Sequence, residues 1–374
     1  MKKIMRVGLV VLVSFMSLSA CTHTSSENTV SESVSPSSVP SVSVQEKSSE
    51  NNRFASVLTS ADLPDPRTMT GISEVDDLPD PSVVEGEFVQ QLPVDIEDAK
   101  KNRVHIDSTK RVMALDVSGT LSRTVIALGF ADYLVGRTVS STEKILEKLP
   151  VVTENGHQLN AESILSLKPD LIFTDGSVGP VEVLDQVKNS GVKVVYVSSQ
   201  HSAEQVTEVT SMIAGALGVP DAGKALNEKI VKDIADVQKT IDQWAPEKPL
   251  DISFLYVRGT AGIFFILGKD DGAGNLISLL KGNDIAGEKG INGTTPANSE
   301  SLVAMNPDVF FVMKNGLEST GGKAGFLARS GVSQTKAGKN ERIISIPDGI
   351  ALSFGPQTAD ILYNIAKALY GVKE

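Results

Sequence analysis

Hydrophobic and polar positions follow the same order in two segments that lie far apart in the chain. Residues 160–173 (NAESILSLKPDLIF) and 298–311 (NSESLVAMNPDVFF) share Asn, Glu, Ser, Pro, Asp and the final Phe, and their apolar positions keep their class. Each copy predicts a short helix that is capped by Asn and stops before Pro-Asp, followed at once by a buried strand. The copies are too far apart for a solenoid, whose repeats span about 20–50 residues. The duplication therefore indicates two similar α/β lobes, and a cleft between lobes is a common ligand site.

Short apolar runs alternate with amphipathic segments around both copies, which predicts alternating strands and helices. In the first half we expect a hairpin within 91–107, strands at 111–115, 134–137, 171–174 and 194–197, and helices at 121–128, 180–190 and 203–217. In the second half we expect strands at 252–258, 263–267, 309–313 and 342–346, a helix that ends at 278–280, and a closing helix at 360–370. Such alternation is typical of largely parallel sheets covered on both faces, whose ligands bind beyond the carboxyl ends of the strands.

A longer amphipathic segment separates the two halves. Residues 221–244 are polar overall, but apolar residues recur at roughly a helical period from Ala225 to Ile241. The segment follows a Gly-Val-Pro stop signal at 218–220 and ends before Pro246. At about 1.5 Å per residue, such a helix is long enough to span a domain. We therefore expect one long helix that joins the two lobes.

The N-terminus has the pattern of a secretory signal peptide. Basic residues at positions 2, 3 and 6 precede an apolar run at 7–16 that is too short to span a membrane comfortably. The following Leu-Ser-Ala-Cys at 18–21 resembles the lipobox of bacterial lipoproteins, and this resemblance implies that Cys21 is acylated and becomes the first residue of the mature protein. Cys21 is the only cysteine, so the chain forms no intramolecular disulfide and no cysteine cluster for a metal.

These features divide the chain into a signal peptide (1–20), a lipidated tether (21–60), an N-terminal extension with the first lobe (61–218), the bridging helix (219–246) and the second lobe (247–374). The tether is rich in Ser, Val, Glu and Pro and has no sustained period, which is typical of a flexible segment. The extension carries Leu-Pro-Asp-Pro at 63–66 and again at 78–81. Paired prolines favour extended or turn conformations, so we expect the extension on the surface of the first lobe.

The composition excludes several classes of function. The net charge of −11 argues against nucleic-acid binding and against adsorption on an anionic membrane by charge alone. The sequence has no Gly-x-Gly-x-x-Gly after a strand, no complete P-loop, no Gly-x-Ser-x-Gly and no His-Glu-x-x-His. These absences favour a binding protein over an enzyme.

Four histidines are available as metal ligands or acid–base groups. His23 lies in the tether and His105 precedes the first lobe, so both are most simply exposed. His157 lies in a polar turn just before the first repeated helix, and His201 follows the fourth strand. Either of the last two can face a cleft, although an arbitrary loop histidine is more often only a surface residue.

Tyr256 and Arg258 lie two residues apart in an apolar strand. Period two places both side chains on one face, about 7 Å apart along the strand. A guanidinium beside a phenol stabilises the phenolate, a hard anionic donor that suits ferric iron, and tyrosine is a known axial ligand of haem. The alternative is a core tyrosine whose hydroxyl meets a buried charge.

Glu162 and Glu300 occupy matching positions in the two repeated helices. Each carboxylate can simply be stabilised by the helix dipole in the first turn. Alternatively, the two charges mark equivalent points on the two lobes that dock onto a symmetric partner with arginine pockets. The duplication alone does not choose between these alternatives.

From about Leu92 to Gly371 the chain resembles the substrate-binding lipoproteins of iron-siderophore, cobalamin and haem ABC importers, and among these the hemin-binding lipoproteins of actinobacterial haem uptake. The similar segments are ALDVSGTLSRTV at 114–125, VGRTVS at 135–140, VTENGHQLNAE at 152–162, LYVRG at 255–259 and FGP at 354–356. The resemblance implies a class III periplasmic-binding-protein fold, in which two Rossmann-like α/β lobes are joined by one long helix. It also implies that the protein stays outside the cytoplasm, held at the membrane by its lipid alone, and delivers ferric haem to the permease and ATPase subunits of an importer. Upstream surface haem-binding proteins are possible donors.

The same resemblance suggests a role for each candidate residue. It implies His157 and Tyr256 as axial ligands on opposite faces of the haem iron, Arg258 hydrogen-bonded to the tyrosine, and Met313 near the haem edge. Arg137 is a candidate contact for a haem propionate, and Glu162 with Glu300 would form salt bridges to the permease.

Three alternatives remain at the level of the sequence. A siderophore or cobalamin binder of the same fold would need aromatic and arginine groups, and the chain has one Trp and five Tyr. A surface enzyme that uses Tyr256 or His157 as acid or base has no nucleophile motif to support it. A zinc-binding lipoprotein usually needs several histidines in its cleft, and only His157 and His201 are suitably placed here.

Overall fold

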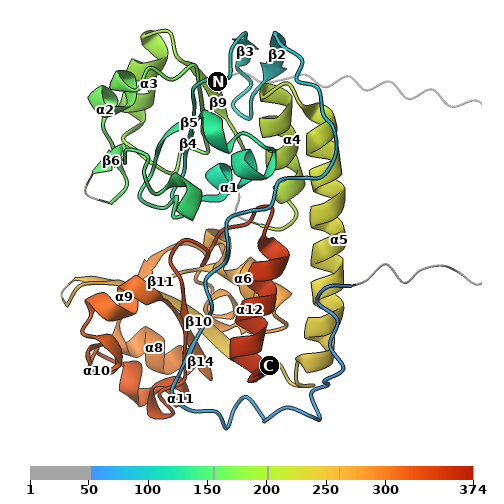
Figure 1. The fold of residues 1–374 in the computed structure, drawn as a ribbon. Coiled ribbons are helices and arrows are strands. Elements are labelled where there is room, and N and C mark those ends of the chain that lie inside the picture. Colours follow the sequence, from blue (N-terminus) through green and yellow to red (C-terminus); the bar gives the residue numbers. More distant parts are fainter. Residues whose placement is uncertain (1–51, 155, 200–201, 261, 374) are drawn as a thin grey trace, which may run out of the picture. The chain divides into compact units, whose positions relative to one another are not determined.

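The structure of the chain, a computed structural model, describes residues 52–154, 156–199, 202–260 and 262–373 (Figure 1). Residues 49–374 form one compact unit, to which all described helices and strands belong. Its described residues build two sheets, each covered by helices, with a long helix between them in the sequence. Cys21 and His23, to which the sequence assigns a lipid and a place in the tether, lie outside the described residues.

The first lobe is built on a parallel four-stranded sheet with the order β5-β4-β8-β9. Its strands are β4 (Val112–Leu115), β5 (Leu134–Arg137), β8 (Leu171–Thr174) and β9 (Lys193–Tyr196). Its helices are α1 (Thr120–Ala127), α2 (Ala161–Ser166), α3 (Val181–Asn189) and α4 (Val206–Ala216), with short 3-10 turns at Ala131–Tyr133 and Lys144–Leu146. Every residue of β4 and β8 is buried, which explains why these central strands have apolar runs without alternation.

Two hairpins accompany this sheet. Strands β2 (Val94–Glu97) and β3 (Arg103–Ile106) pair with each other, as the sequence predicts for residues 91–107. Strands β6 (Thr153–Glu154) and β7 (Gln158–Leu159) form a second, shorter hairpin directly before α2. The turn of this second hairpin carries His157.

The second lobe is built on a seven-stranded mixed sheet with the path β1-β15-β14-β10-β11-β13, and β12 also pairs with β10. Its strands are β1 (Ile72–Glu74), β10 (Asp251–Arg258), β11 (Ile263–Ile266), β12 (Asn283–Asp284), β13 (Thr295–Pro296), β14 (Val309–Met313) and β15 (Ile343–Ile346). Its helices are α6 (Ala273–Leu279), α7 (Ile285–Glu288), α8 (Ser299–Met305), α9 (Lys314–Ser319), α10 (Gly322–Leu327), α11 (Lys336–Lys339) and α12 (Thr358–Tyr370), with 3-10 turns at Lys269–Asp271 and Val332–Gln334.

The repeated helix–strand pattern is confirmed in both lobes. Asn160 caps α2 by accepting a hydrogen bond from the Ser163 N–H at 2.9 Å, and Asn298 caps α8 in the same way from Ser301 at 2.8 Å. Each helix is followed by a buried strand, β8 in the first lobe and β14 in the second. The two segments are therefore equivalent elements of the two sheets.

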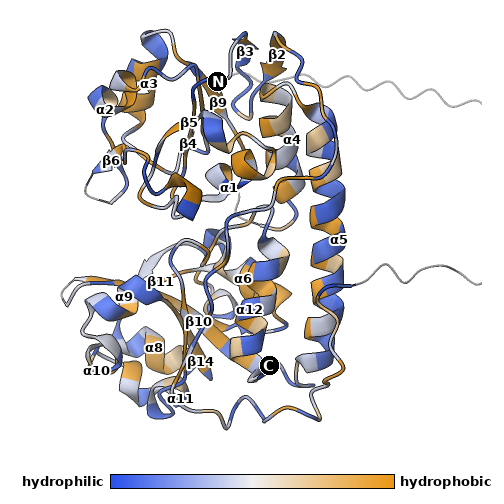
Figure 2. Cartoon of the chain, in the orientation of Figure 1, coloured by the Kyte–Doolittle hydropathy of each residue, from blue (hydrophilic) through white to orange (hydrophobic). Residues whose placement is uncertain are grey.

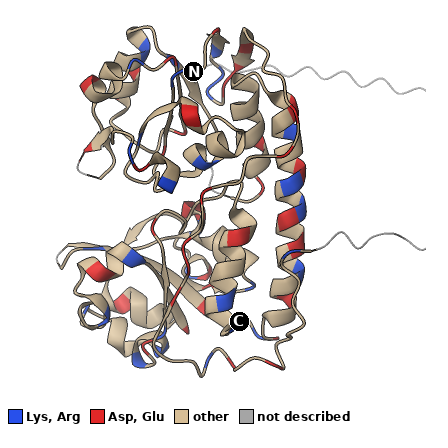
Figure 3. Ribbon diagram, in the orientation of Figure 1, with Lys and Arg blue, Asp and Glu red and all other residues tan. Residues whose placement is uncertain are grey.

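Helix α5 (Pro220–Trp244) is the long helix expected from the sequence. It begins with Pro220 in its first turn, where the missing N–H costs nothing. The helix packs against α4 of the first lobe and α12 of the second. Its apolar residues form a stripe on one side, and charged residues of both signs alternate along its length (Figures 2 and 3). Throughout the described ranges, every helix is too short or too polar to span a lipid bilayer.

The placement of the N-terminal extension was predicted incorrectly for its first part only; its later part contacts the first lobe as expected, with the Val84 N–H donating to the Ala127 carbonyl at 2.8 Å. Strand β1 pairs in parallel with β15 and is therefore an edge strand of the second sheet, not a surface segment of the first lobe. Residues 52–60, which the sequence assigned to the tether, also contact the folded unit. Phe54 is buried, and Arg53 forms ion pairs with Asp233 of α5 and Asp360 of α12.

Candidate functional site

Tyr256 and Arg258 lie at the end of β10 in the second lobe, between β11 on one side and β14 on the other. Both side chains are half-buried, whereas the alternate residues Leu255 and Val257 are fully buried. The pleat therefore places Tyr256 and Arg258 on one face, as their spacing predicts. The guanidinium carbon of Arg258 lies 4.9 Å from the centre of the Tyr256 ring, which is a cation–π arrangement.

Arg258 is held in place by a residue of the neighbouring strand β14 and by one that follows β15, the next strand along the sheet. It forms an ion pair with Asp348, which follows β15, and its Nη2 lies 3.8 Å from the sulfur of Met313 at the end of β14. The other oxygen of Asp348 accepts a hydrogen bond from the Asn315 N–H at 2.8 Å. None of the hydrogen bonds of Arg258 goes to the Tyr256 hydroxyl, in contrast to the expected pairing. A charged carboxylate is the stronger acceptor, and Asp348 occupies the end of the guanidinium.

His157 lies in the β6–β7 turn of the first lobe. Its side chain is exposed, and its backbone carbonyl accepts a hydrogen bond from the Gly179 N–H at 3.3 Å. Although the ring surface stays open to water, desolvation by the surrounding chain lowers the pKa of His157 below its usual range, and the positive charge of Arg258 lowers this pKa further. Both effects favour the neutral imidazole, which is the form that binds metals. His157 belongs to the first lobe and Arg258 to the second.

Arg137 lies at the end of β5 in the first lobe and is half-buried. Its Nη1 donates to the carbonyl oxygens of Thr138, at 3.4 Å, and Ser141, at 3.2 Å. Its Nε is buried and has no hydrogen-bond partner. The guanidinium forms no ion pair with any described residue, so its charge is available to a carboxylate from outside the chain.

Glu162 and Glu300 are both exposed in the first turns of α2 and α8. Neither forms an ion pair with another residue in the part of the chain that the structure describes. The two carboxylates are thus solvent-facing charges at equivalent points of the two lobes.

Of the remaining histidines, His105 is exposed in the β2–β3 hairpin, with its Nδ1 2.9 Å from an oxygen of Asp95. This contact fits the surface role expected for it. His201, the other candidate from the sequence, lies outside the described residues.

Two charged residues at the end of β10 were missed by sequence reasoning. Asp348 is far from Arg258 in the sequence, and it becomes a neighbour because β15, β14 and β10 lie side by side with parallel directions. The feature of the sequence that could have indicated Asp348 is its position directly after a strand. Arg329 follows α10; its guanidinium lies 4.9 Å from the Phe264 ring centre and donates to the Gly259 carbonyl at the end of β10. Burial lowers the pKa of Arg329.

Comparison with known proteins agrees with this architecture. The profile of the family described as periplasmic binding protein matches residues 117–349. Among solved structures, the heme binding protein HmuT is 45% identical over 83% of this chain and 100% of its own, with a TM-score of 0.81. Three further structures of HmuT carry single replacements by alanine, of a tyrosine, an arginine and a histidine.

Two more distant structures share the fold. The periplasmic heme-binding protein RhuT from Roseiflexus sp. RS-1, in apo form, is 31% identical over 71% of this chain and 99% of its own, with a TM-score of 0.66. The periplasmic heme-binding protein BhuT, in complex with two hemes, is 29% identical over 70% of this chain and 100% of its own, with a TM-score of 0.62. No curated protein matches the chain.

These similarities confirm the fold class that the sequence predicts, two α/β lobes joined by one long helix. Proteins of this kind work outside the cytoplasm and bind a ligand without converting it. The profile covers more than half of the chain, and HmuT matches over its entire length. The chain therefore belongs to the family of periplasmic binding proteins.

Proposed function

We propose that this protein captures ferric haem, with His157 and Tyr256 as axial ligands from the two lobes, and delivers it to an ABC permease. The observation that carries the proposal is the placement of three side chains: the guanidinium of Arg258 lies 4.9 Å from the centre of the Tyr256 ring at the end of β10 in the second lobe, and His157 lies in the β6–β7 turn of the first lobe. A neutral imidazole and a phenol next to a cation thus come from opposite lobes. Imidazole and phenolate are both established axial ligands of haem iron.

The relatives support the choice of ligand and of residues. HmuT, RhuT and BhuT are all described as heme-binding. In the HmuT variants, the replaced tyrosine and arginine are two positions apart, and the replaced histidine lies 99 positions before the tyrosine. His157, Tyr256 and Arg258 are separated by the same intervals in this chain.

The chemistry gives each residue a role. The phenolate of Tyr256 neutralises part of the charge of ferric iron, and the guanidinium of Arg258 packs against the tyrosine ring. The neutral imidazole of His157 occupies the opposite face of the haem. Met313 supplies a polarizable contact at the haem edge, and Arg137, which forms no ion pair with a described residue, binds a propionate. An anionic ligand favours the ferric over the ferrous state, since it compensates the higher charge of the metal.

The test is a titration of residues 49–374 with hemin, followed by absorption and EPR spectra. We expect binding of one hemin per chain with a charge-transfer band from tyrosinate to iron. Tyr256→Ala should remove this band, and His157→Ala should keep the band but change the spin state. The matched controls are Tyr133→Ala, an exposed tyrosine on the first lobe, and His105→Ala; both should leave the spectra unchanged.

Two outcomes would count against the proposal. Absence of saturable hemin binding would exclude haem as the ligand and point to another iron chelate, while leaving family membership untouched. Saturable binding with an unchanged spectrum in both site variants would exclude the proposed ligands.

A further inference from the structure

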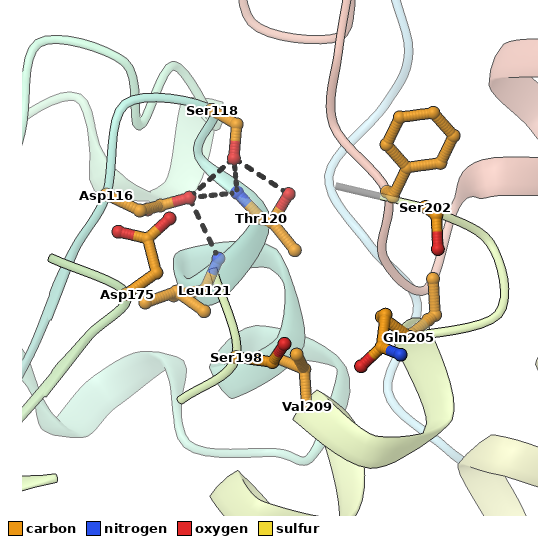
Figure 4. A pocket seen from close by; sticks show the side chains of 11 residues that line it. Asp116, Ser118, Thr120, Leu121, Asp175, Ser198, Ser202, Gln205 and Val209 are labelled. Atoms are coloured by element: carbon orange, nitrogen blue, oxygen red, sulfur yellow. Dashed lines mark hydrogen bonds between the residues drawn. The ribbon is translucent and has the colours of Figure 1, made fainter. Parts of the chain in front are cut away.

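The loop between β15 and α12, residues 347–357, connects two elements of the second lobe but rests on the first lobe. The hydroxyl oxygen of Ser353 lies 3.2 Å from that of Thr120 at the start of α1. Phe354 lines a small pocket of the first lobe, together with Val209 of α4 and other residues (Figure 4). The loop is therefore a contact between the lobes, and haem ligation by His157 and Tyr256 alone gives it no role.

The beginning of this loop meets Thr142, which follows β5 in the first lobe. A Cβ atom on Gly349 would collide with the hydroxyl of Thr142, and its two next neighbours, at 3.2 and 3.3 Å, also belong to Thr142. A side chain at position 349 would therefore have to displace either Thr142 or the loop. The first lobe thus limits where the loop can begin.

Asp348 directly precedes Gly349 and joins two elements of the second lobe. Its Oδ1 pairs with Nη2 of Arg258 on β10, and its Oδ2 accepts from the Asn315 N–H at the start of α9, at 2.8 Å. The side chain of Asp348 is only 18% exposed, so water screens this ion pair less than it screens a fully exposed one. Because each oxygen has a different partner, a displacement of Asp348 must lengthen at least one of the two contacts.

Helix α9 also restricts the guanidinium of Arg258. A Cβ atom on Gly316 would lie 2.5 Å from Nη1 of Arg258, so glycine at this position lets α9 pack directly against the cation. An arginine side chain has many rotamers, and the contacts with Asp348 and α9 select one of them. In this rotamer the guanidinium carbon lies 4.9 Å from the centre of the Tyr256 ring.

We propose that Asp348 and Thr142 are positioning residues for haem binding: Thr142 holds the start of the loop in place, and Asp348 carries this position to Arg258 beside Tyr256. The inference rests on the proposed role of Tyr256 as an iron ligand. When the lobes separate, the loop loses its contact with Thr142, and Asp348 no longer fixes the guanidinium against the tyrosine ring. Separation of the lobes by the permease would then disturb the tyrosine side of the site as well as withdraw His157.

The first test reads the position of Arg258 in residues 49–374 without haem. With isotope-labelled tyrosine rings, NMR spectra should resolve the five tyrosines, and Tyr256→Phe identifies the signal of Tyr256. Asp348→Asn and Gly349→Ala should each shift this signal, because the cation moves relative to the ring. Thr142→Gly removes all three atoms nearest to the added Cβ, so its combination with Gly349→Ala should restore the signal. Gly293→Ala is the matched control, since its Cβ would meet nothing within 4 Å.

The second test measures the rate at which hemin leaves the same variants, by transfer to an excess of apomyoglobin. Asp348→Asn and Gly349→Ala should each speed dissociation, roughly three- to tenfold for coupled neighbours of this kind. The effect of Asp348→Asn should disappear when Arg258 is already alanine, because Asp348 acts through Arg258. A merely structural role of Asp348 would persist in the Arg258→Ala background.

The proposal is overturned if Asp348→Asn leaves the Tyr256 signal in place, or if it speeds hemin dissociation equally with and without Arg258. It is also overturned if Gly349→Ala leaves the signal unchanged, or if Thr142→Gly does not restore it. Absence of hemin binding to the wild-type chain would refute the proposed function instead, and the NMR signals of the haem-free chain would still decide whether Asp348 and Thr142 position Arg258.

Discussion

Arg258 is the residue through which the proposed ligands of the two lobes influence each other. Its guanidinium lies over the Tyr256 ring, pairs with Asp348 and contacts the sulfur of Met313. Its charge also lowers the pKa of His157 in the other lobe. A single side chain thus packs against one proposed ligand and, together with desolvation, favours the neutral form of the other.

This coupling predicts how the binding of hemin depends on pH. A depressed pKa means that His157 stays neutral to a lower pH than an ordinary histidine, so hemin affinity should fall only when the pH drops through that depressed value. Arg258→Ala removes one of the two causes of the depression and should raise the pKa of His157 in the haem-free chain. NMR titration of the histidine ring protons measures this pKa directly. His105 is the internal control; an unchanged pKa of His157 in Arg258→Ala would contradict the electrostatic contact.

Part of this arrangement of side chains could be predicted from the sequence. The spacing of Tyr256 and Arg258 in an apolar strand was sufficient to predict that they share a face. The ion pair of Arg258 with Asp348 could not be predicted from the sequence, because it depends on which strands become neighbours in the sheet. The expected hydrogen bond from Arg258 to the tyrosine stays a prediction; in the structure the guanidinium pairs instead with Asp348, a carboxylate that follows another strand.

At the scale of elements, the two capped helices α2 and α8 are the repeated parts of the fold. Each carries an exposed glutamate in its first turn, and neither glutamate has an ion-pair partner among the described residues. Stabilisation by the helix dipole acts within each helix separately and does not require a glutamate at the matching position of the other helix. Docking onto a symmetric partner would require both Glu162 and Glu300.

Reversal of both charges separates these alternatives. We expect Glu162→Lys with Glu300→Lys to abolish haem import by cells that depend on this transporter, because the lysines would repel arginine pockets of the permease. Hemin affinity of the isolated protein should be unchanged. Reversal of Glu182 and Glu288, two exposed glutamates on other helices, is the control and should leave import intact. Normal import with the first pair reversed would restrict Glu162 and Glu300 to a local role in their helices.

Long or strongly patterned elements were the most predictable ones. Helix α5 and the repeated segments have a sustained period and clear stop signals, and their bounds differ by only a residue or two from those expected. Strand β1 was not predicted, because its three residues are too few to show a period. Strand β1 pairs with the edge of the sheet that β15 offers, and the sequence pattern does not show which strand forms that edge.

At the scale of the whole molecule, the proposed lipid anchor would leave the binding unit at the membrane surface. Cys21 lies outside the described residues, so this proposal rests on the sequence alone. Cys21→Ala should release the protein from the membrane fraction without changing its hemin affinity. Mass spectrometry of the mature wild-type N-terminus should find an acylated cysteine. An unmodified Cys21 would exclude the anchor.

The two lobes also meet through a buried charged junction. Arg123 of α1 forms an ion pair with Glu143, with 3.0 Å between Nε and Oε1, and both residues are 3% exposed. Nη1 of Arg123 donates to the Gln357 side chain at 2.7 Å, at the start of α12 in the second lobe. Gln357 in turn donates to the Pro79 carbonyl at 2.9 Å, within the second Leu-Pro-Asp-Pro motif. This motif thus helps to connect the extension with both lobes.

The junction predicts that loss of Arg123 alone destabilises the protein much more than loss of both Arg123 and Glu143. Arg123→Met should lower the free energy of unfolding by about 3–5 kcal/mol, because it leaves the carboxylate of Glu143 buried without its cation. Burial already raises the pKa of Glu143, and removal of Arg123 should raise it further, so the loss should be largest at alkaline pH and smaller where Glu143 is protonated. Adding Glu143→Leu to Arg123→Met should recover most of the loss, since an apolar pair no longer carries a buried charge. Denaturant unfolding of the single and double variants at two pH values measures these differences. Equal stability of Arg123→Met at both pH values, or no recovery in the double variant, would show that packing and the bond to Gln357 outweigh the ion pair.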